Sequence, residues 1–189
     1  MSAQDSKLFV ISGPSGAGKG TLVTRVRERR SNLGLTVSAT TRAPRKGEVD
    51  GVNYFFLTRE EFDRRVANGE FVEWAEVHGS CYGTLVSEVT SKLASGSSLI
   101  LEIDVQGALQ VKERFPEAVL IFIKPPSLEV LRERLVGRGT ETPETIELRM
   151  ANAADELALA DRYDDVVVND DLDRATDELV RVLDMHERI

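Results

Sequence analysis

The sequence predicts an α/β fold, a three-layer sandwich in which helices cover both faces of a parallel sheet. Short apolar runs at residues 7–12 (KLFVIS), 99–104 (LILEID) and 119–123 (VLIFI) alternate with longer segments of helical pattern. Apolar runs between helices are typical of parallel strands that are buried on both faces. A glycine-rich loop directly after the first run favours the same class, because such loops join a strand to a helix in α/β proteins.

The other elements of the core follow from hydrophobic spacing and from end signals. We expect helices at residues 19–30, 105–114, 128–138, 143–160 and 172–187, and a short last strand at residues 166–168 (VVV). Thr142 followed by Pro143 predicts an N-cap and a first-turn proline for one of these helices.

Residues 37–93 have a different pattern and interrupt the parallel core. Residues 53–57 and 70–77 alternate and carry aromatic side chains, which is typical of antiparallel strands. Thr58 and Glu61 have the spacing of a capping box and predict a helix between the two strands. The sequence therefore predicts an inserted, mixed α+β unit.

Length and composition exclude several classes of protein. A chain of 189 residues corresponds to one domain, at about 150 residues each. The single cysteine, Cys81, cannot form an internal disulfide, which favours a reducing compartment. There is neither a run of about 18 apolar residues nor a signal-peptide pattern, so we expect a cytoplasmic protein. The net charge of −8 argues against a basic surface for nucleic acid, but locally concentrated cations can still bind a small anion.

A phosphate-binding loop is predicted between the first strand and the first helix, and it consists of Gly13-Pro14-Ser15-Gly16-Ala17-Gly18-Lys19-Gly20-Thr21. Its glycines allow backbone N–H groups to face phosphate oxygens, and Lys19 supplies a full charge for the β- and γ-phosphates. The loop departs from the Walker pattern at Gly20, where a serine or threonine normally binds Mg²⁺. The metal contact then shifts to Thr21, or is made by water, phosphates and carboxylates, and the sequence leaves both open.

Glu102 and Asp104 lie at the carboxyl end of a predicted strand, the edge at which open α/β sheets bind ligands. Strand alternation predicts that the two carboxylates share a face, because Ile103 lies between them. We expect them to contact a nucleotide or a metal, with Glu102 as a candidate Mg²⁺ ligand. For Asp104 the alternative is the N-cap of the next helix.

Five sequence blocks together resemble the guanylate kinase family, whose members transfer a phosphoryl group from ATP to GMP. The blocks are residues 13–22 (GPSGAGKGTL), 37–56 (VSATTRAPRKGEVDGVNYFF), 69–84 (GEFVEWAEVHGSCYGT), 101–107 (LEIDVQG) and 133–142 (ERLVGRGTET). The resemblance implies one domain with three parts: a core at about residues 1–36, 94–127 and 151–189, a GMP-binding insertion at about 37–93, and a lid at about 128–150. It also implies Mg²⁺ with ATP as co-substrate, GMP or dGMP as acceptor, and a place in purine nucleotide metabolism. We expect a monomer or small homo-oligomer that binds neither nucleic acid nor membrane.

The resemblance also assigns the guanine contacts. Glu73 would accept the N1–H and N2–H donors of the base, with the hydroxyls of Ser38 and Thr84 near O6 and Asp104 reaching toward the bound GMP. Adenine lacks these two donors and would leave Glu73 buried without partners, which gives selectivity. From spacing alone, Glu73 would be interpreted as an exposed strand residue.

The phosphate contacts that the resemblance implies fall into three sets. The GMP phosphate would be held by Arg42, Arg45, Tyr54 and Tyr82. The charge of the transferred group would be neutralised by Lys19, Arg42, Arg138 and Arg149, and ATP would contact residues 13–21 with Arg134, Arg138 and Asn169. Two alternatives stay open. Asn169 could cap a loop, and Arg134 or Arg138 could pair with nearby glutamates. Arg25, Arg27, Arg29 and Arg30 are interpreted as the solvated end of a helix.

Two other functions compete with this interpretation. A guanylate-kinase-like interaction module would bind a protein on the GMP surface, but Gly13, Gly18 and Lys19 of the phosphate loop are all present. A kinase for another nucleotide or a small alcohol is disfavoured by the set of Ser38, Glu73 and Thr84.

Overall fold

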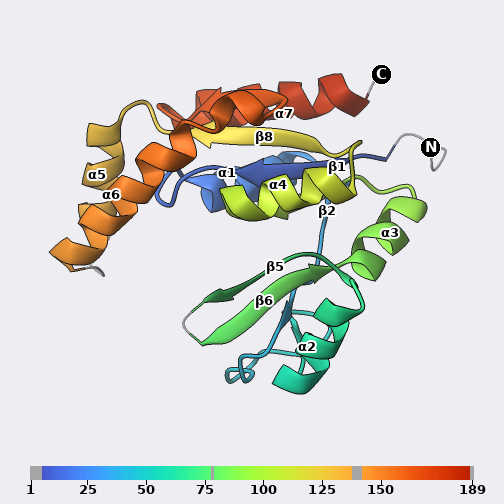
Figure 1. Ribbon diagram of the computed structural model, residues 1–189. Coiled ribbons are helices and arrows are strands. Elements are labelled where there is room, and N and C mark those ends of the chain that lie inside the picture. The colour runs from blue at the N-terminus through green and yellow to red at the C-terminus, as the bar shows by residue number, and fades with distance from the viewer. Residues whose placement is uncertain (1–5, 78, 138–141, 188–189) are drawn as a thin grey trace.

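The computed structural model describes residues 6–77, 79–137 and 142–187, and it has the predicted α/β architecture (Figure 1). All pairs in its five-stranded sheet are parallel. In spatial order β2-β7-β1-β8-β9, the strands are β2 (Gly34–Leu35), β7 (Leu99–Glu102), β1 (Leu8–Ser12), β8 (Val119–Lys124) and β9 (Asp165–Val168). The sequence analysis missed β2, which has only two residues and no apolar run.

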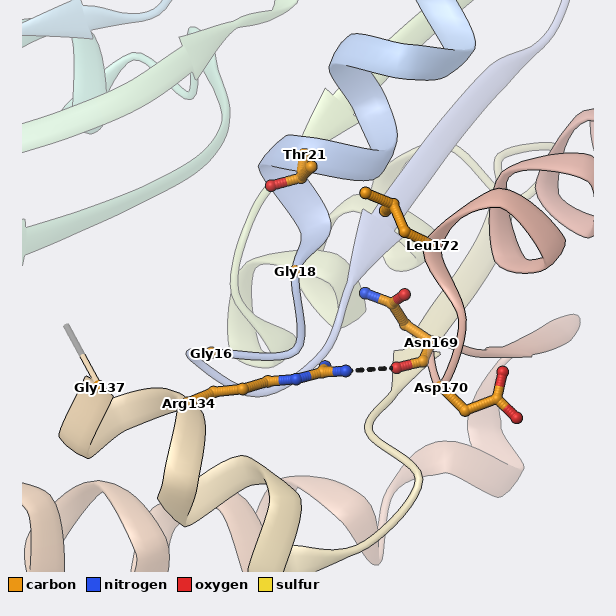
Figure 2. A pocket seen from close by; sticks show the side chains of 8 residues that line it. All are labelled: Gly16, Gly18, Thr21, Arg134, Gly137, Asn169, Asp170 and Leu172. Atoms are coloured by element: carbon orange, nitrogen blue, oxygen red, sulfur yellow. Dashed lines mark hydrogen bonds between the residues drawn. The ribbon is translucent and has the colours of Figure 1, made fainter.

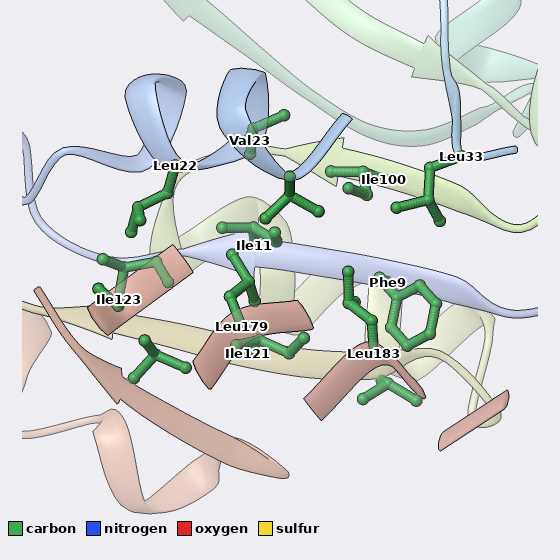
Figure 3. Packing of buried hydrophobic residues seen from close by; sticks show 14 of the residues in the cluster. Phe9, Ile11, Leu22, Val23, Leu33, Ile100, Ile121, Ile123, Leu179 and Leu183 are labelled. Atoms are coloured by element: carbon green, nitrogen blue, oxygen red, sulfur yellow. The ribbon is translucent and has the colours of Figure 1, made fainter. Parts of the chain in front are cut away.

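Side-chain alternation explains why both faces of this sheet are apolar. Phe9 and Ile11 point to the face covered by α1 (Lys19–Arg29) and α7 (Leu172–Glu187), where Figure 3 shows them beside Leu179 and Leu183. The intervening residues, Leu8 and Val10, belong to the cluster on the opposite face, together with α4 (Val105–Arg114). The helices therefore fix the sheet from both sides.

A second sheet lies below the core in Figure 1 and has the order β4-β3-β6-β5. Its strands are β3 (Ala39–Thr40), β4 (Phe55–Phe56), β5 (Phe71–Val77) and β6 (Ser80–Leu85). β5 and β6 are antiparallel, as predicted for residues 70–77, but the antiparallel prediction for residues 53–57 is wrong because β4 pairs in parallel with β3. The long loop between β3 and β4 allows the parallel pairing, since it returns the chain to the starting end.

Two helices accompany this sheet. α2 (Arg59–Ala67) begins as predicted at Thr58, whose Oγ1 accepts a hydrogen bond from the Glu61 N–H at 3.2 Å. The Glu61 carboxylate binds Arg64 and Arg65. The sequence analysis did not predict α3 (Val86–Ala94), which packs against the core through Val89.

Helices α5 (Leu128–Gly137) and α6 (Pro143–Leu157) lie at the left end of the core in Figure 1. They pack on each other through a separate cluster of Leu131, Leu135 and Ala153. Thr142 caps α6 as predicted, accepting from the Thr145 N–H at 3.3 Å. α6 ends before the predicted residue 160, because the chain turns through a short 3₁₀ helix (Ala160–Arg162) to enter β9.

The arginines of α1 differ from the prediction of a solvated helix end. Arg25, Arg29 and Arg30 form ion pairs along α7, with Asp173, Asp177 and Glu187 respectively. The first two pairs are exposed and contribute little to stability, whereas the Arg30 side chain is only 13% exposed. Sequence spacing alone does not reveal that α7 packs beside α1. None of the helices in the described ranges is both long and apolar enough to cross a membrane.

Candidate active site

The phosphate loop forms where it was predicted, between β1 and α1 at the carboxyl edge of the parallel sheet. Lys19 folds over the loop, and its Nζ donates to the carbonyl oxygens of Gly13 at 2.5 Å and Pro14 at 3.1 Å. α1 starts without a side-chain cap, so its first N–H groups are available to an anion. The loop therefore combines a helix N-terminus with the positive charge of the Lys19 ammonium group.

Asn169, which follows β9, supports this loop from the side (Figure 2). The side chain is buried, and Nδ2 donates to the Ala17 carbonyl oxygen at 2.8 Å. Gly18 has φ +93°, and a Cβ there would lie 2.3 Å from Nδ2 of Asn169, so only glycine fits. Arg134 of α5 donates to the Asn169 carbonyl oxygen at 2.8 Å. These residues line a cavity of about 490 Å³ beside the loop.

The second helical pair reaches the loop through Arg149, whose Nη1 donates to Ser15 Oγ at 2.6 Å. Arg134 and Arg149 thus contact the loop and its neighbour Asn169 from α5 and α6, and their action on one polyphosphate stays a prediction. Arg138, the other predicted cation, lies outside the described residues.

Thr21 and Glu102 line one small cavity of about 290 Å³ together with Lys19 and Gly20. A Cβ on Gly20 would lie 3.5 Å from Glu102 Oε1, so the Walker position faces this carboxylate. Burial raises the pKa of Glu102, and the charge of Lys19 partly offsets the rise. A hydroxyl and a carboxylate beside a phosphate loop are oxygen ligands that suit Mg²⁺.

Asp104 takes one of the two roles that the sequence predicts for it. β7 ends at Glu102, and Asp104 is the N-cap of α4, where Oδ1 accepts from the Gly107 N–H at 2.7 Å. Ile103 still donates to the Ile11 carbonyl oxygen of β1 and packs in the same cluster as Leu101, so the shared face of Glu102 and Asp104 stays a prediction. The alternative role as a helix cap is confirmed.

A β-bulge in β5 turns Glu73 toward the core. The register shifts between Phe71 and Glu73, which leaves Val72 as the extra residue. Phe71 and Trp74 consequently share one face, and their ring centroids lie 4.3 Å and 6.2 Å from that of Phe62. Glu73 takes the other face.

Glu73 is half-buried and does not point into bulk solvent. Its Oε1 accepts a hydrogen bond from the buried Thr84 hydroxyl at 2.8 Å, and Oε2 lies near the start of α4. Burial raises the pKa of Glu73, the Thr84 hydrogen bond opposes the rise, and the charge of Asp104 adds to it. The insertion thus brings Glu73 and Thr84 close to Asp104 of the core, as the resemblance implies.

Gly83 makes this arrangement possible, and the sequence analysis missed its role. A Cβ at Gly83 would lie 2.7 Å from the Phe71 ring and 2.8 Å from the Glu73 carbonyl oxygen, which is too close for any other residue. A glycine inside a strand pattern, between Tyr82 and Thr84, is the signal that could have indicated a close backbone approach.

The predicted phosphate-binding residues of the insertion are partly assembled. The Arg42 guanidinium lies 5.4 Å from the centroid of the Tyr54 ring, and the Tyr54 and Tyr82 rings are 6.2 Å apart. Arg45 is exposed, and its charge contributes to lowering the pKa of Glu48. Glu48, which the sequence analysis did not single out, pairs with Arg42 at 2.8 Å.

Comparisons with known proteins agree with this geometry. Residues 5–186 match the family model described as guanylate kinase. The guanylate kinase of Gloeobacter violaceus is 56% identical over 178 residues, covering 94% of this chain and 87% of the relative. That of Halalkalibacterium halodurans is 51% identical over 183 residues, covering 97% and 90%. The crystal structure of guanylate kinase from Anaplasma phagocytophilum has a TM-score of 0.72 and 36% identity, covering 96% of this chain and 86% of that one. This chain therefore belongs to the guanylate kinase family.

Proposed function

We propose that this chain is an enzyme that transfers the γ-phosphoryl group of ATP to GMP, giving ADP and GDP. The observation that carries the proposal is a cavity of about 420 Å³ between the two sheets. Gly20 and Glu102 line it from the phosphate loop side, and Ser38 and Tyr54 line it from the segments around the second sheet. A donor on the loop and an acceptor on the second sheet would therefore meet in one space.

The donor side is assigned to residues 13–21 with Arg134 and Asn169. Lys19 would exchange its present carbonyl partners for oxygens of the β- and γ-phosphates. The Asn169 amide already donates a hydrogen bond to the Ala17 carbonyl oxygen. This bond supports a role for Asn169 in holding the loop in the conformation that binds the phosphates. Arg134 and Asn169 line the neighbouring cavity, whose size suits the rest of the nucleotide.

The acceptor side is assigned to the second sheet. Glu73, Thr84, Ser38 and Asp104 would recognise guanine through the donors at N1 and N2 and the acceptor at O6. The phosphate would bind Arg42, Arg45, Tyr54 and Tyr82. No residue of either set is assigned to the 2′ position of the ribose, so we extend the proposal to dGMP.

Transfer would require positioning and charge neutralisation rather than a covalent intermediate. Lys19, Arg42 and Arg149 are assigned to the charge of the transferred group, together with Arg138 beyond the described residues. Movement of the insertion (about residues 37–93) and of a lid (about 128–150) toward the core (about 1–36, 94–127 and 151–189) would exclude water, which would otherwise accept the phosphoryl group.

Mg²⁺ is the cofactor we propose, held by Thr21 and Glu102. The oxygen donors of this pair fit the ion, which neutralises charge on the ATP phosphates when bound. Within the described ranges no cluster of three or more His, Cys, Asp or Glu could hold a metal. This supports a site completed by phosphate and water ligands. We further propose that small nucleotides are the only substrates and that the protein is cytoplasmic.

A coupled assay of ADP release tests the function, with GMP, dGMP, AMP, CMP and UMP as acceptors. We expect release with GMP and dGMP, and background rates with the other three. Equal rates with AMP would contradict the role of Glu73 in selectivity. No release with any acceptor would favour the interaction module.

A further inference from the structure

The loop between β3 and β4 contains a carboxylate that the proposed chemistry does not use. Glu48 binds the end of the Arg42 guanidinium with both oxygens, Nη2 to Oε1 at 2.8 Å and Nη1 to Oε2 at 3.1 Å. The two side chains are only 17% and 19% exposed, so solvent screens the pair weakly. The Glu48 hydrogen bond is the main cause of a raised pKa of Arg42, and the pKa of Glu48 is lowered in turn.

The same carboxylate also fixes the turn that carries Arg45. Oε2 of Glu48 accepts a hydrogen bond from the Arg45 backbone N–H at 2.6 Å, and the Glu48 N–H donates to the Arg45 carbonyl oxygen at 3.0 Å. Both bonds are local to the turn. One residue therefore sets the positions of both arginines that are assigned to the acceptor phosphate.

The N–H donors of Arg42 that do not bind Glu48 are arranged so that they can bind a phosphate. A guanidinium has five N–H donors in one plane. Three of those of Arg42 go to the two Glu48 oxygens and the Ala43 carbonyl oxygen. Nε–H and the second Nη2–H, which bind neither Glu48 nor Ala43, form the side edge of the fork. That edge is a bidentate site for a phosphate. The rings of Tyr54 and Phe56 lie 5.4 Å and 5.9 Å from the guanidinium carbon, and the Tyr82 hydroxyl lies close enough to raise the pKa of Arg42.

We propose that Glu48 is a positioning residue for the acceptor phosphate. It holds the end of Arg42, so that the side edge faces the place of the phosphate beside Tyr82, and it fixes the turn of Arg45. This inference rests on the proposed assignment of Arg42 and Arg45 to the GMP phosphate. The opposite role, a carboxylate that competes with the phosphate for Arg42, fits less well because the turn bonds hold Glu48 in place independently of Arg42.

Calorimetric titration of Glu48→Gln with GMP and with guanosine tests the proposal, because guanosine has the base but no phosphate. Glutamine keeps the length of the side chain but cannot accept with both end atoms. We expect GMP affinity to fall about tenfold, the loss of one charged hydrogen bond, while guanosine affinity and the KM for ATP stay within about twofold. Glu48→Asp keeps the charge but is shorter, and we expect it to lie between wild type and Glu48→Gln.

Glu61→Gln is the matched control. Glu61 is also an acid of the insertion that binds arginines, Arg64 and Arg65, and their hydrogen bonds lower its pKa to about 2. It lies on α2, away from the proposed phosphate site, so we expect unchanged GMP affinity.

Several outcomes would overturn the proposal. Unchanged or tighter GMP binding by Glu48→Gln would make Glu48 a bystander or a competitor. Parallel weakening of GMP and guanosine, or loss of the folded circular dichroism spectrum in both Glu48 variants, would show a purely structural role. A wild-type protein that binds GMP no more tightly than guanosine would instead contradict the assignment of Arg42 and Arg45, which distinguishes that failure from a failure of Glu48 alone.

Discussion

Replacing Glu73 with glutamine tests guanine recognition with little change in volume. The glutamine Oε1 can still accept the hydrogen bond that Thr84 now donates at 2.8 Å, so the contact between β5 and β6 survives. The other carboxylate oxygen becomes an NH₂ group. That group would oppose one of the two donors of guanine, N1–H or N2–H, instead of accepting a hydrogen bond from it.

The size of the effect follows from the hydrogen bonds that are lost. A hydrogen bond to a charged group contributes about 1.5–3 kcal/mol; guanine would lose one such bond, would keep the other only to a neutral oxygen, and would leave one buried donor unpaired. We expect a loss of about 3 kcal/mol of transition-state stabilisation, or about two orders of magnitude in kcat/KM for GMP. The preference for GMP over IMP, which lacks the N2 amine, should narrow in the same variant.

The stability of Glu73→Gln should not fall together with its activity. Burial raises the pKa of Glu73 in the folded chain, so folding disfavours its ionised form. This cost is absent below the unfolded-state pKa of the side chain, and it grows as the pH rises through the raised folded-state pKa. Glutamine removes the cost, so the melting temperature of Glu73→Gln at pH 7 should equal or exceed that of wild type. In wild type, kcat/KM for GMP should fall as the pH is lowered through the same pKa, and the variant should lack this dependence.

Coupled ADP release gives kcat and KM for GMP and ATP, and circular dichroism gives the melting temperature. A KM for GMP within threefold of wild type would refute the reasoning. An equal rise in the KM for ATP, or a large fall in the melting temperature, would show that the substitution damages the fold rather than the base contact.

Three further predictions concern single residues. Lys19→Ala should lose most turnover, by about two orders of magnitude or more, with an unchanged circular dichroism spectrum, and near-normal turnover would contradict its role at the phosphates. Gly83→Ala should raise the KM for GMP by a larger factor than the KM for ATP, because its methyl group would lie 2.8 Å from the Glu73 carbonyl oxygen. Unchanged kinetics would mean that the bulge does not orient Glu73. Gly20→Ser fits the space beside Glu102 and restores the Walker hydroxyl, so the Mg²⁺ concentration for half-maximal activity should fall, whereas an identical Mg²⁺ titration would place the metal elsewhere.

The sequence was sufficient for features with a strong local signal. The apolar runs of β1, β7 and β8, the glycines of the phosphate loop and the Thr142 cap each predicted an element that the structure contains. Strand and helix signals of this kind depend on neighbours within a few residues, so they do not require knowledge of the fold.

Features that depend on distant parts of the chain were not predictable. The pairing of Arg30 with Glu187 requires that α1 and α7 lie side by side, and the contact between Asn169 and Ala17 requires that β9 end beside the phosphate loop. The bulge before Glu73 is a register choice that also depends on the tertiary packing of Phe71 and Trp74 on Phe62. The resemblance supplied the role of Glu73, which spacing alone would have made an exposed strand residue.

Four of the cations assigned to phosphates, Lys19, Arg42, Arg134 and Arg149, have partners within the chain, and this shapes how a nucleotide would bind. Lys19 binds loop carbonyls, Arg134 binds the Asn169 carbonyl, and Arg149 binds the Ser15 hydroxyl. A phosphate would exchange these neutral partners for charged ones, which are about twice as strong, while the side chains are already held near the site. Arg42 binds a charged partner, Glu48, with both of its carboxylate oxygens. A phosphate gains little by displacing a carboxylate from a bidentate pair, so GMP is expected to add to the side edge of Arg42 and leave Glu48 in place.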